Sequence, residues 1–171
     1  MISLVMDTSN SYLAVGLYQD NVCLEAFQEK GSRRQSEKAI PTLKEVLDRH
    51  HIALKDVNEM IITSGPGSYT GVRVAMTIAK TLAAVSDVRI KSVSSLAAYA
   101  GMNQALSVID ARGHKVFVGV YENGLPLIKE QVVTLEDFAH LRAEYEDFEL
   151  VGEVGSVSYT HLRAHETLRH L

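Results

Sequence analysis

The chain has 171 residues, of which 46% are hydrophobic and 22% charged, and its formal net charge is −4. This composition is typical of a globular protein, so we expect neither extended disorder nor a membrane-spanning segment. The net charge does not require a large basic surface for nucleic acid, and a local basic patch stays open. The start of the chain has no basic region before its first acid, so we expect no signal peptide, no membrane association and a cytoplasmic location. The single cysteine, Cys23, fits a reducing compartment and is expected to be buried in a strand.

The first hundred residues alternate between short apolar strands and amphipathic helices. Periodicity and turn residues predict, in chain order, strands over 2–7, 12–18 and 22–27, a helix over 36–49, a strand over 60–63, a helix over 72–85, a strand over 89–93 and a short helix ending at 100. The links between the first three strands are too short for parallel crossovers, so these strands are expected to form an antiparallel meander.

The same pattern begins again after residue 102. Strands are predicted over 106–109, 116–121 and 125–133, a helix over 135–142 and a strand over 148–151. The sequence therefore predicts an α/β protein with two duplicated βββα lobes. The first lobe is expected over 1–101, and the second, which is incomplete, over 102–155.

Residues 156–171 differ in character from the rest of the chain. The run 157–167 reads as the translation of a sequencing-library adapter, so we expect a non-native tail over 156–171. His161 and His165 are four residues apart and imitate a zinc site, but they fall in this tail. We therefore expect no metal site.

A glycine-rich run, Gly-Pro-Gly-Ser-Tyr-Thr-Gly over 65–71, joins a predicted strand to a predicted helix. Its backbone N–H groups could hold a phosphate, or Gly65 and Gly67 could simply permit a tight turn. The run lacks the Gly-Lys-Ser/Thr ending of a P-loop and the spacing of a dinucleotide-binding loop. Asp7, Thr8 and Ser9 at the end of the first strand could likewise contact a nucleotide or Mg²⁺, or only shape the turn.

The helix after this run is apolar on most of its circumference. Gly71, Ala75, Ala79 and Ala83 recur at every fourth position and form a ridge of small side chains. Such a helix is buried on more than one side. We expect the ridge to pack against a helix of a partner, with burial inside this chain as the alternative.

Four segments occur in the order and spacing of the TsaB family: 7–9, the specific run 65–73, 93–96 and 109–112. The chain is identified as a member of that family over residues 1–155, with the rest of the second lobe missing. The resemblance implies an actin/hexokinase/Hsp70-like fold built of RNase H-like lobes. It also implies a non-catalytic scaffold or activating subunit in the synthesis of N6-threonylcarbamoyladenosine, next to the anticodon of tRNAs that read codons beginning with A.

The implied partners are the catalytic subunit TsaD in a heterodimer, the ATPase TsaE and, through the complex, tRNA. A homodimer would use the same surface, formed by the helices beginning at Ser36 and Gly71. ATP or ADP with Mg²⁺ is expected only within the assembled complex, with no bound cofactor and no catalytic residue in this chain. The interface residues implied are Ser36, Ile40, Leu43, Ser68, Tyr69, Thr70, Gly71, Arg73, Ala75 and Ala79.

The catalytic relative carries a metal-binding His-x-x-x-His on its first helix, whereas the corresponding stretch 33–41 contains no histidine. Two other classes remain open from the sequence: an ATP-dependent sugar-kinase-like enzyme, which the fold would suit, and a glycoprotease-like peptidase. The first needs an acidic base and a closed cleft, and the second needs a nucleophile–base pair or metal ligands.

Overall fold

The computed structural model describes residues 1–30, 35–153 and 155, and these form two compact units. The first unit spans residues 1–94 and the second begins at residue 95. The expected non-native tail over 156–171, with its histidines, lies outside the described residues.

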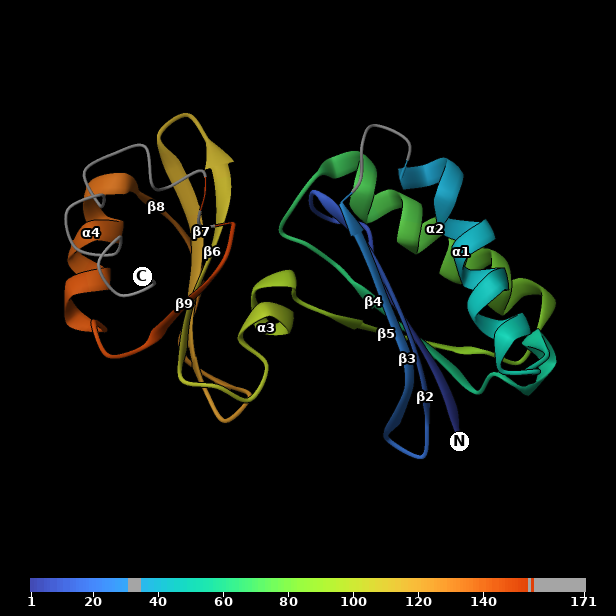
Figure 1. Ribbon diagram of the computed structural model, residues 1–171. Coiled ribbons are helices and arrows are strands. Elements are labelled where there is room, and N and C mark those ends of the chain that lie inside the picture. The colour runs from blue at the N-terminus through green and yellow to red at the C-terminus, as the bar shows by residue number, and fades with distance from the viewer. Residues whose placement is uncertain (31–34, 154, 156–171) are drawn as a thin grey trace. The chain divides into compact units, whose positions relative to one another are not determined.

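The first unit is a five-stranded sheet in the order β3-β2-β1-β4-β5, covered on one face by two helices. β1 pairs antiparallel with β2 and parallel with β4, and Figure 1 shows α1 and α2 side by side on the same face of the sheet. The elements are β1 (Ile2–Asp7), β2 (Tyr12–Gln19), β3 (Val22–Lys30), α1 (Gln35–Arg49), the short 3-10 helix η1 (Leu54–Asp56), β4 (Glu59–Thr63), α2 (Tyr69–Val85) and β5 (Arg89–Val93).

The core of the first unit lies between the sheet and the two helices. Alternate residues of β1 and β4 point toward the helices, as the two-residue period of a strand requires. Leu4, Met6, Met60 and Ile62 are fully buried there, beneath apolar residues of α1 and α2. The intervening positions, which include the polar residues Ser3 and Glu59, face the other side of the sheet.

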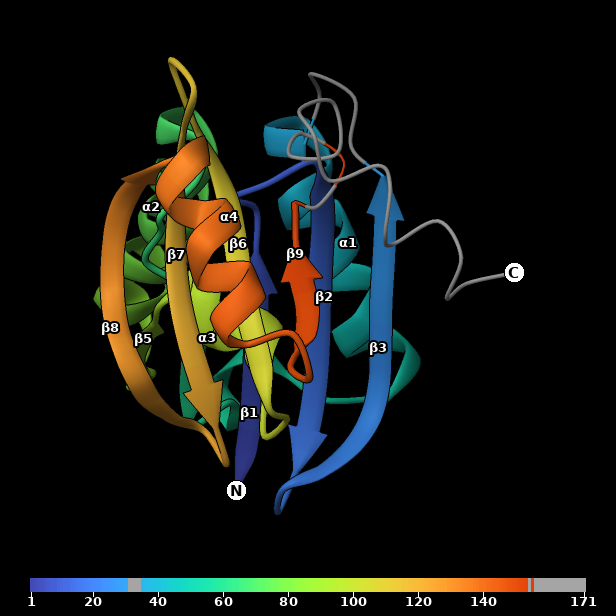
Figure 2. The same ribbon diagram turned by 90° about the vertical axis from the view of Figure 1, so that its left-hand side faces the viewer.

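The second unit repeats this plan with a four-stranded sheet in the order β8-β7-β6-β9. Its elements are α3 (Ser95–Ala100), β6 (Ala105–Arg112), β7 (Lys115–Glu122), β8 (Leu125–Thr134), α4 (Leu135–Glu144) and β9 (Glu149–Gly152). Helix α4 lies over one face of the sheet, as Figure 2 shows, and packs on Leu106 and Val108 through Phe138. Helix α3 packs on the opposite face, against Ala105 and Ile109.

Residues that favour tight turns connect the hairpin strands in both units. Asp20 and Asn21 join β2 to β3 with φ of 50° and 67°, and Asn123 and Gly124 join β7 to β8 with φ of 53° and 76°. Two consecutive positive φ angles are typical of the tight hairpin turns that match the twist of the strands. The antiparallel meander predicted for each lobe is thereby confirmed.

The fold class expected from the sequence is also confirmed, because a three-stranded meander followed by a parallel strand occurs twice. Some details differ. The division of the chain falls after residue 94 and not after residue 101, because α3 packs on β6, β7 and β9. Cys23 is exposed and not buried, because it lies on the edge strand β3 next to the hairpin turn. No helix among the residues described is long and apolar enough to cross a membrane.

Candidate functional site

A shallow groove of about 350 Å³ lies between α1 and α2. Two large apolar side chains beside it are exposed to solvent, Ile40 of α1 at 60% and Tyr69 of α2 at 72%. Large apolar side chains exposed together in a concave surface indicate a place where another molecule binds. The groove is lined by Ser36, Ile40, Tyr69, Thr70, Arg73, Val74, Thr77 and Ile78.

The start of α2 positions the aromatic and cationic side chains of the groove. Ser68 is the N-cap, and its hydroxyl accepts a hydrogen bond from the N–H of Gly71 at 3.2 Å. This cap starts the helix at Tyr69, three residues earlier than the sequence predicted, and places Tyr69 and Arg73 on one face at four-residue spacing. The guanidinium carbon of Arg73 lies 4.4 Å from the centre of the Tyr69 ring, in a cation–π contact.

The ridge of small residues on α2 faces the unit's own sheet, which corrects the expectation that it meets a partner. Ala75 and Ala79 have no exposed surface, and Gly71 is buried as well. A Cβ added to Gly71 would lie 2.0 Å from the carbonyl oxygen of Thr8. The small side chains therefore let α2 approach the end of β1, and burial inside the chain, the alternative left open, is what the structure shows.

Leu43 is a second correction to the expected interface. It is 6% exposed and belongs to the core cluster under α1. Its position one turn beyond Ala39 puts it on the face of α1 that packs on β2. Of the ten residues expected at the interface, the structure brings Ser36, Ile40, Tyr69, Thr70 and Arg73 together in the groove and leaves Ser68 exposed at its end.

Three lining residues, Val74, Thr77 and Ile78, were not among the expected interface residues. Val74 and Ile78 follow Thr70 at steps of four residues, and Thr77 follows Arg73 in the same way. Helical periodicity applied from Thr70 and Arg73 would have found all three.

The residues singled out for a nucleotide contact lie together in the loop after β1. The Oδ1 atom of Asp7 accepts three hydrogen bonds, from the Ser9 N–H at 2.8 Å, the Ser9 hydroxyl at 2.6 Å and the Thr63 hydroxyl at 2.6 Å. Thr8 donates its hydroxyl to the carbonyl oxygen of Gly71 at 2.6 Å, and both Thr8 and Ser9 are fully buried. These side chains therefore hold the loop against β4 and α2.

Close backbone approaches require glycine at positions 67 and 71, and a positive φ favours it at position 65. The Ser68 N–H donates to the Ser9 carbonyl oxygen at 2.7 Å, and a Cβ on Gly67 would lie 2.4 Å from that same oxygen. Gly65 has a φ of 96° and precedes a cis peptide bond to Pro66. The tight-turn interpretation of Gly65 and Gly67 thus has a direct structural basis.

The end of β6 has an acidic turn that matches the end of β1. The Asp110 carboxylate accepts a hydrogen bond from the Arg112 N–H at 2.7 Å. Burial raises the pKa of the nearby Glu153 carboxyl, and the charge of Asp110 adds to the rise, while a hydrogen bond from the Asp110 N–H opposes it. Within residues 1–30, 35–153 and 155, no three His, Cys, Asp or Glu side chains gather in a way that could hold a metal ion.

The two repeated sheets and their helices define the chain as a protein of the actin/hexokinase/Hsp70-like class. A family model described as "TsaD: tRNA N6-adenosine threonylcarbamoyltransferase" matches residues 28–153. The chain is 33% identical over 153 residues to the tRNA threonylcarbamoyladenosine biosynthesis protein TsaB of Bacillus subtilis, which covers 84% of this chain and 67% of that protein.

TsaB of Escherichia coli is 31% identical over 132 residues, covering 71% of this chain and 57% of that protein. The solved structure of YeaZ from Pseudomonas aeruginosa matches with a TM-score of 0.69 and 27% identity, over 78% of this chain and 66% of that chain. The chain therefore belongs to the TsaB family of tRNA threonylcarbamoyladenosine biosynthesis proteins. It spans between 57% and 67% of the length of the two curated relatives.

Proposed function

We propose that this chain is a non-catalytic partner subunit of a TsaD-type transferase in tRNA threonylcarbamoyladenosine synthesis, and that the groove between α1 and α2 is its binding surface. The printed names of its relatives support the pathway. The groove supports the mode of action, because it is the concave apolar surface that a partner helix requires.

The observation that carries the proposal is the exposure of Ile40 and Tyr69 on two adjacent helices of the same unit. Full burial of a large apolar side chain is worth about 1.5–3 kcal/mol, and covering the exposed part of each of these two would gain a fraction of that. A helix laid into the groove would cover both of them together with Val74. It would recover that free energy without disturbing the core, because Leu43, Ala75 and Ala79 already pack inward.

Likeness between this chain and the transferase family supports the choice of partner. The family model that matches residues 28–153 is that of the transferase itself. Two chains of one fold can pair through equivalent surfaces, as identical subunits do around a two-fold axis. The partner's own pair of helices would then meet α1 and α2, and a homodimer through the same groove is the competing assembly.

The division of labour in the proposal follows from the sequence of the first helix. The stretch 33–41 contains no histidine, whereas the resemblance places the metal-binding pair of the catalytic relative there. The partner would supply the metal chemistry, and this chain would supply a surface. TsaE, tRNA and ATP with Mg²⁺ would join the assembled complex, in the cytoplasm.

Binding to TsaD tests the proposal. The chain and its Ile40→Glu variant are titrated calorimetrically with TsaD from the same genome. Leu125→Glu on β8, where the side chain is 68% exposed against 60% for Ile40, serves as the matched control. We expect the wild type and Leu125→Glu to bind and Ile40→Glu to lose binding, with unchanged thermal melts for all three. Failure of the wild type to bind TsaD, or equal binding by Ile40→Glu, would overturn the proposal.

A further inference from the structure

Lys91 on β5 differs from the other ion-paired lysines of the first unit in the burial of its carboxylate. Its Nζ atom lies 2.6 Å from Oε2 of Glu59, and the Glu59 side chain is buried whereas that of Lys91 is 59% exposed. An exposed amine therefore neutralises a carboxylate that is largely removed from water. The other two lysine pairs have carboxylates that are 43% and 62% exposed: Glu29 with Lys38 and Asp48 with Lys44.

The Glu59 carboxylate has few other partners. The Ser3 hydroxyl donates to Oε1 at 2.9 Å, but Oε2 has no hydrogen-bond partner among the described residues beyond its ion pair with Lys91. Arg89 stands beside Glu59 in the β4–β5 register, yet its guanidinium contacts the Met1 sulfur, 3.9 Å away. Within the described part of the chain, Lys91 is therefore the only cation in a salt bridge with Glu59.

A lysine that has been acylated no longer carries a positive charge. Lys91 lies on an edge strand of the sheet and outside the lining of the groove between α1 and α2. An acyl phosphate suits this position, because it reacts with an amine in solution and needs no binding pocket. We propose that Lys91 is an acylation site, that its acyl donor is an acyl phosphate, and that its modification lowers the stability of the first unit. The inference does not depend on the proposed function.

The reaction joins the Lys91 nitrogen to the acyl group. The amine, after releasing its proton to water, attacks the carbonyl carbon of the acyl phosphate, and the bond from that carbon to the phosphate oxygen breaks. Inorganic phosphate leaves with the electron pair of the broken bond and takes up the further proton that the nitrogen gives up as the amide forms. No oxidant or reductant takes part.

Acylation at Lys91 differs in its consequence from acylation at Lys44. An acylated Lys91 leaves Glu59 buried without a counter-charge, so the glutamate must either stay ionised and unpaired or take up a proton, and both are unfavourable. The Asp48 partner of Lys44 is exposed and would simply be hydrated. Because Glu59 joins β1, β4 and β5, loss of its ion pair weakens the sheet on which α1 and α2 pack.

Thermal melts of the full chain at neutral pH test the inference. Lys91→Gln, which is neutral like an acylated lysine, should melt roughly 10 °C below the wild type. Lys91→Arg keeps the charge and should stay within about 3 °C of the wild type, as should the control Lys44→Gln. The double variant Glu59→Gln/Lys91→Gln removes both charges and should regain most of the loss. A Lys91→Gln protein as stable as the wild type, or a double variant no more stable than Lys91→Gln, would overturn the inference.

Acetyl phosphate then tests the modification itself. The wild type and Glu59→Gln are incubated with it, the acetylated lysines are identified by mass spectrometry and the melts are repeated. We expect acetylation at Lys91 in both proteins and a lowered melting temperature only in the wild type, because Glu59→Gln has no buried charge to leave unpaired. An unmodified Lys91 under conditions that acetylate Lys44 would overturn the site, and equal lowering in both proteins would overturn the role of Glu59. Binding to TsaD enters none of these measurements, so the proposed function is tested separately.

Discussion

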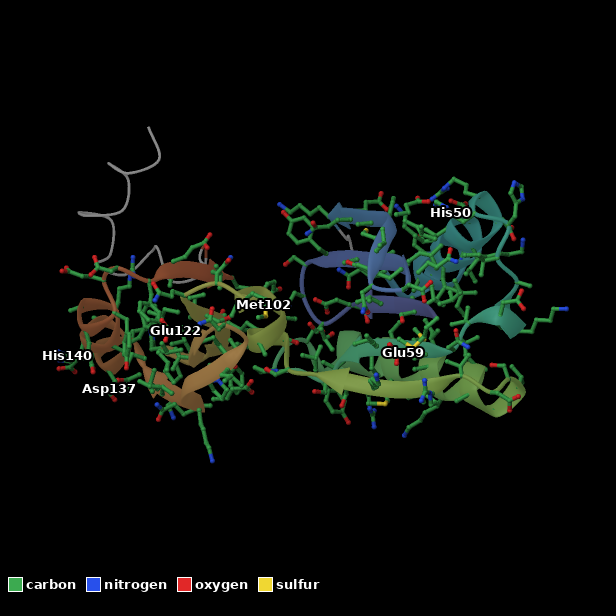
Figure 3. The ribbon with its side chains drawn as sticks, turned by 90° about the horizontal axis from the view of Figure 1, so that it is seen from below. His50, Glu59, Met102, Glu122, Asp137 and His140 are labelled. Atoms are coloured by element: carbon green, nitrogen blue, oxygen red, sulfur yellow. The ribbon has the colours of Figure 1, made fainter. Side chains whose placement is uncertain are left out.

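Glu59 and Lys91 form an ion pair across β4 and β5, with 2.6 Å between Oε2 and Nζ. Glu59, labelled in Figure 3, is only 3% exposed, whereas the Lys91 side chain is 59% exposed. The Ser3 hydroxyl donates to the other carboxylate oxygen at 2.9 Å. The hydrogen bond from Lys91, followed by that from Ser3, lowers the pKa of Glu59 against the opposing effect of burial. A charged glutamate therefore ties three strands together.

Protonation of Glu59 should destabilise the first unit. Its pKa is lower in the folded state than the reference value of 4.5, so its stabilising contribution is present above about pH 4.5 and is lost as pH falls through the folded pKa. We expect the melting temperature of the wild type to fall more steeply below pH 5 than that of Glu59→Gln. Thermal melts from pH 7 to pH 3 check this. Glu149→Gln, at the equivalent register position of β9 but exposed, should follow the wild type. Parallel curves for wild type and Glu59→Gln would contradict the prediction.

Gly71→Ala should destabilise the chain severely. The added methyl group would lie 2.0 Å from the Thr8 carbonyl oxygen, which is backbone and cannot rotate away. We expect a loss of about 3 kcal/mol or more in the free energy of unfolding, measured by urea denaturation. Gly155→Ala, whose Cβ would meet nothing within 4 Å, is the control and should be neutral. A Gly71→Ala variant as stable as the control would mean that α2 does not approach β1 this closely.

Ser107→Ala should stabilise the second unit. The Ser107 hydroxyl is buried in the centre of β6 and has no hydrogen-bond partner among the described residues. Replacing it removes an unsatisfied polar group, so we expect a gain of about 1 kcal/mol in chemical denaturation. Ser3→Ala, which removes a hydroxyl that is bonded to Glu59, should lose stability instead. Changes of the same sign in the two variants would refute this assignment.

Ala79→Glu should abolish the folded first unit. Ala79 has no exposed surface and faces the core from α2, so a carboxylate there would be buried among apolar side chains. Ala84→Glu, on the exposed side of the same helix, should retain a cooperative melt. Circular dichroism melts of the two variants side by side decide the point. A folded Ala79→Glu protein would contradict this prediction, because it would mean that the small-residue ridge is exposed to solvent.

The order and type of the regular elements could be predicted because the local signals agree with the fold. Strand alternation, the Asn-Gly hairpin at 123–124 and the helical spacing of Ala39, Leu43 and Leu47 each act over a few residues. Prediction was less successful at the ends of elements, as at Tyr69, where the Ser68 cap adds most of a turn to α2.

The direction of the helix faces could not be predicted in the same way. Periodicity shows that Gly71, Ala75 and Ala79 share a face, but it does not show what that face meets. That depends on the Thr8 backbone, which is remote in the sequence. The exposure of Ile40 and the burial of Glu59 are set by contacts of the same long-range kind. Four of the ten residues expected at the interface, Leu43, Gly71, Ala75 and Ala79, therefore lie on the buried side of their helices.

The parallel pairing of β1 with β4, called the seam below, has a consequence for the order of events in folding. Its side-chain hydrogen bonds, Ser3 to Glu59 at one end and Thr63 to Asp7 at the other, each join residues 56 positions apart. The β2–β3 hairpin and α1 form from neighbours in the chain, but the seam must close a loop that contains all of them. We expect hairpin and helix to be present in the transition state and the seam to close after it. Thr63→Val would then accelerate unfolding and leave the refolding rate almost unchanged.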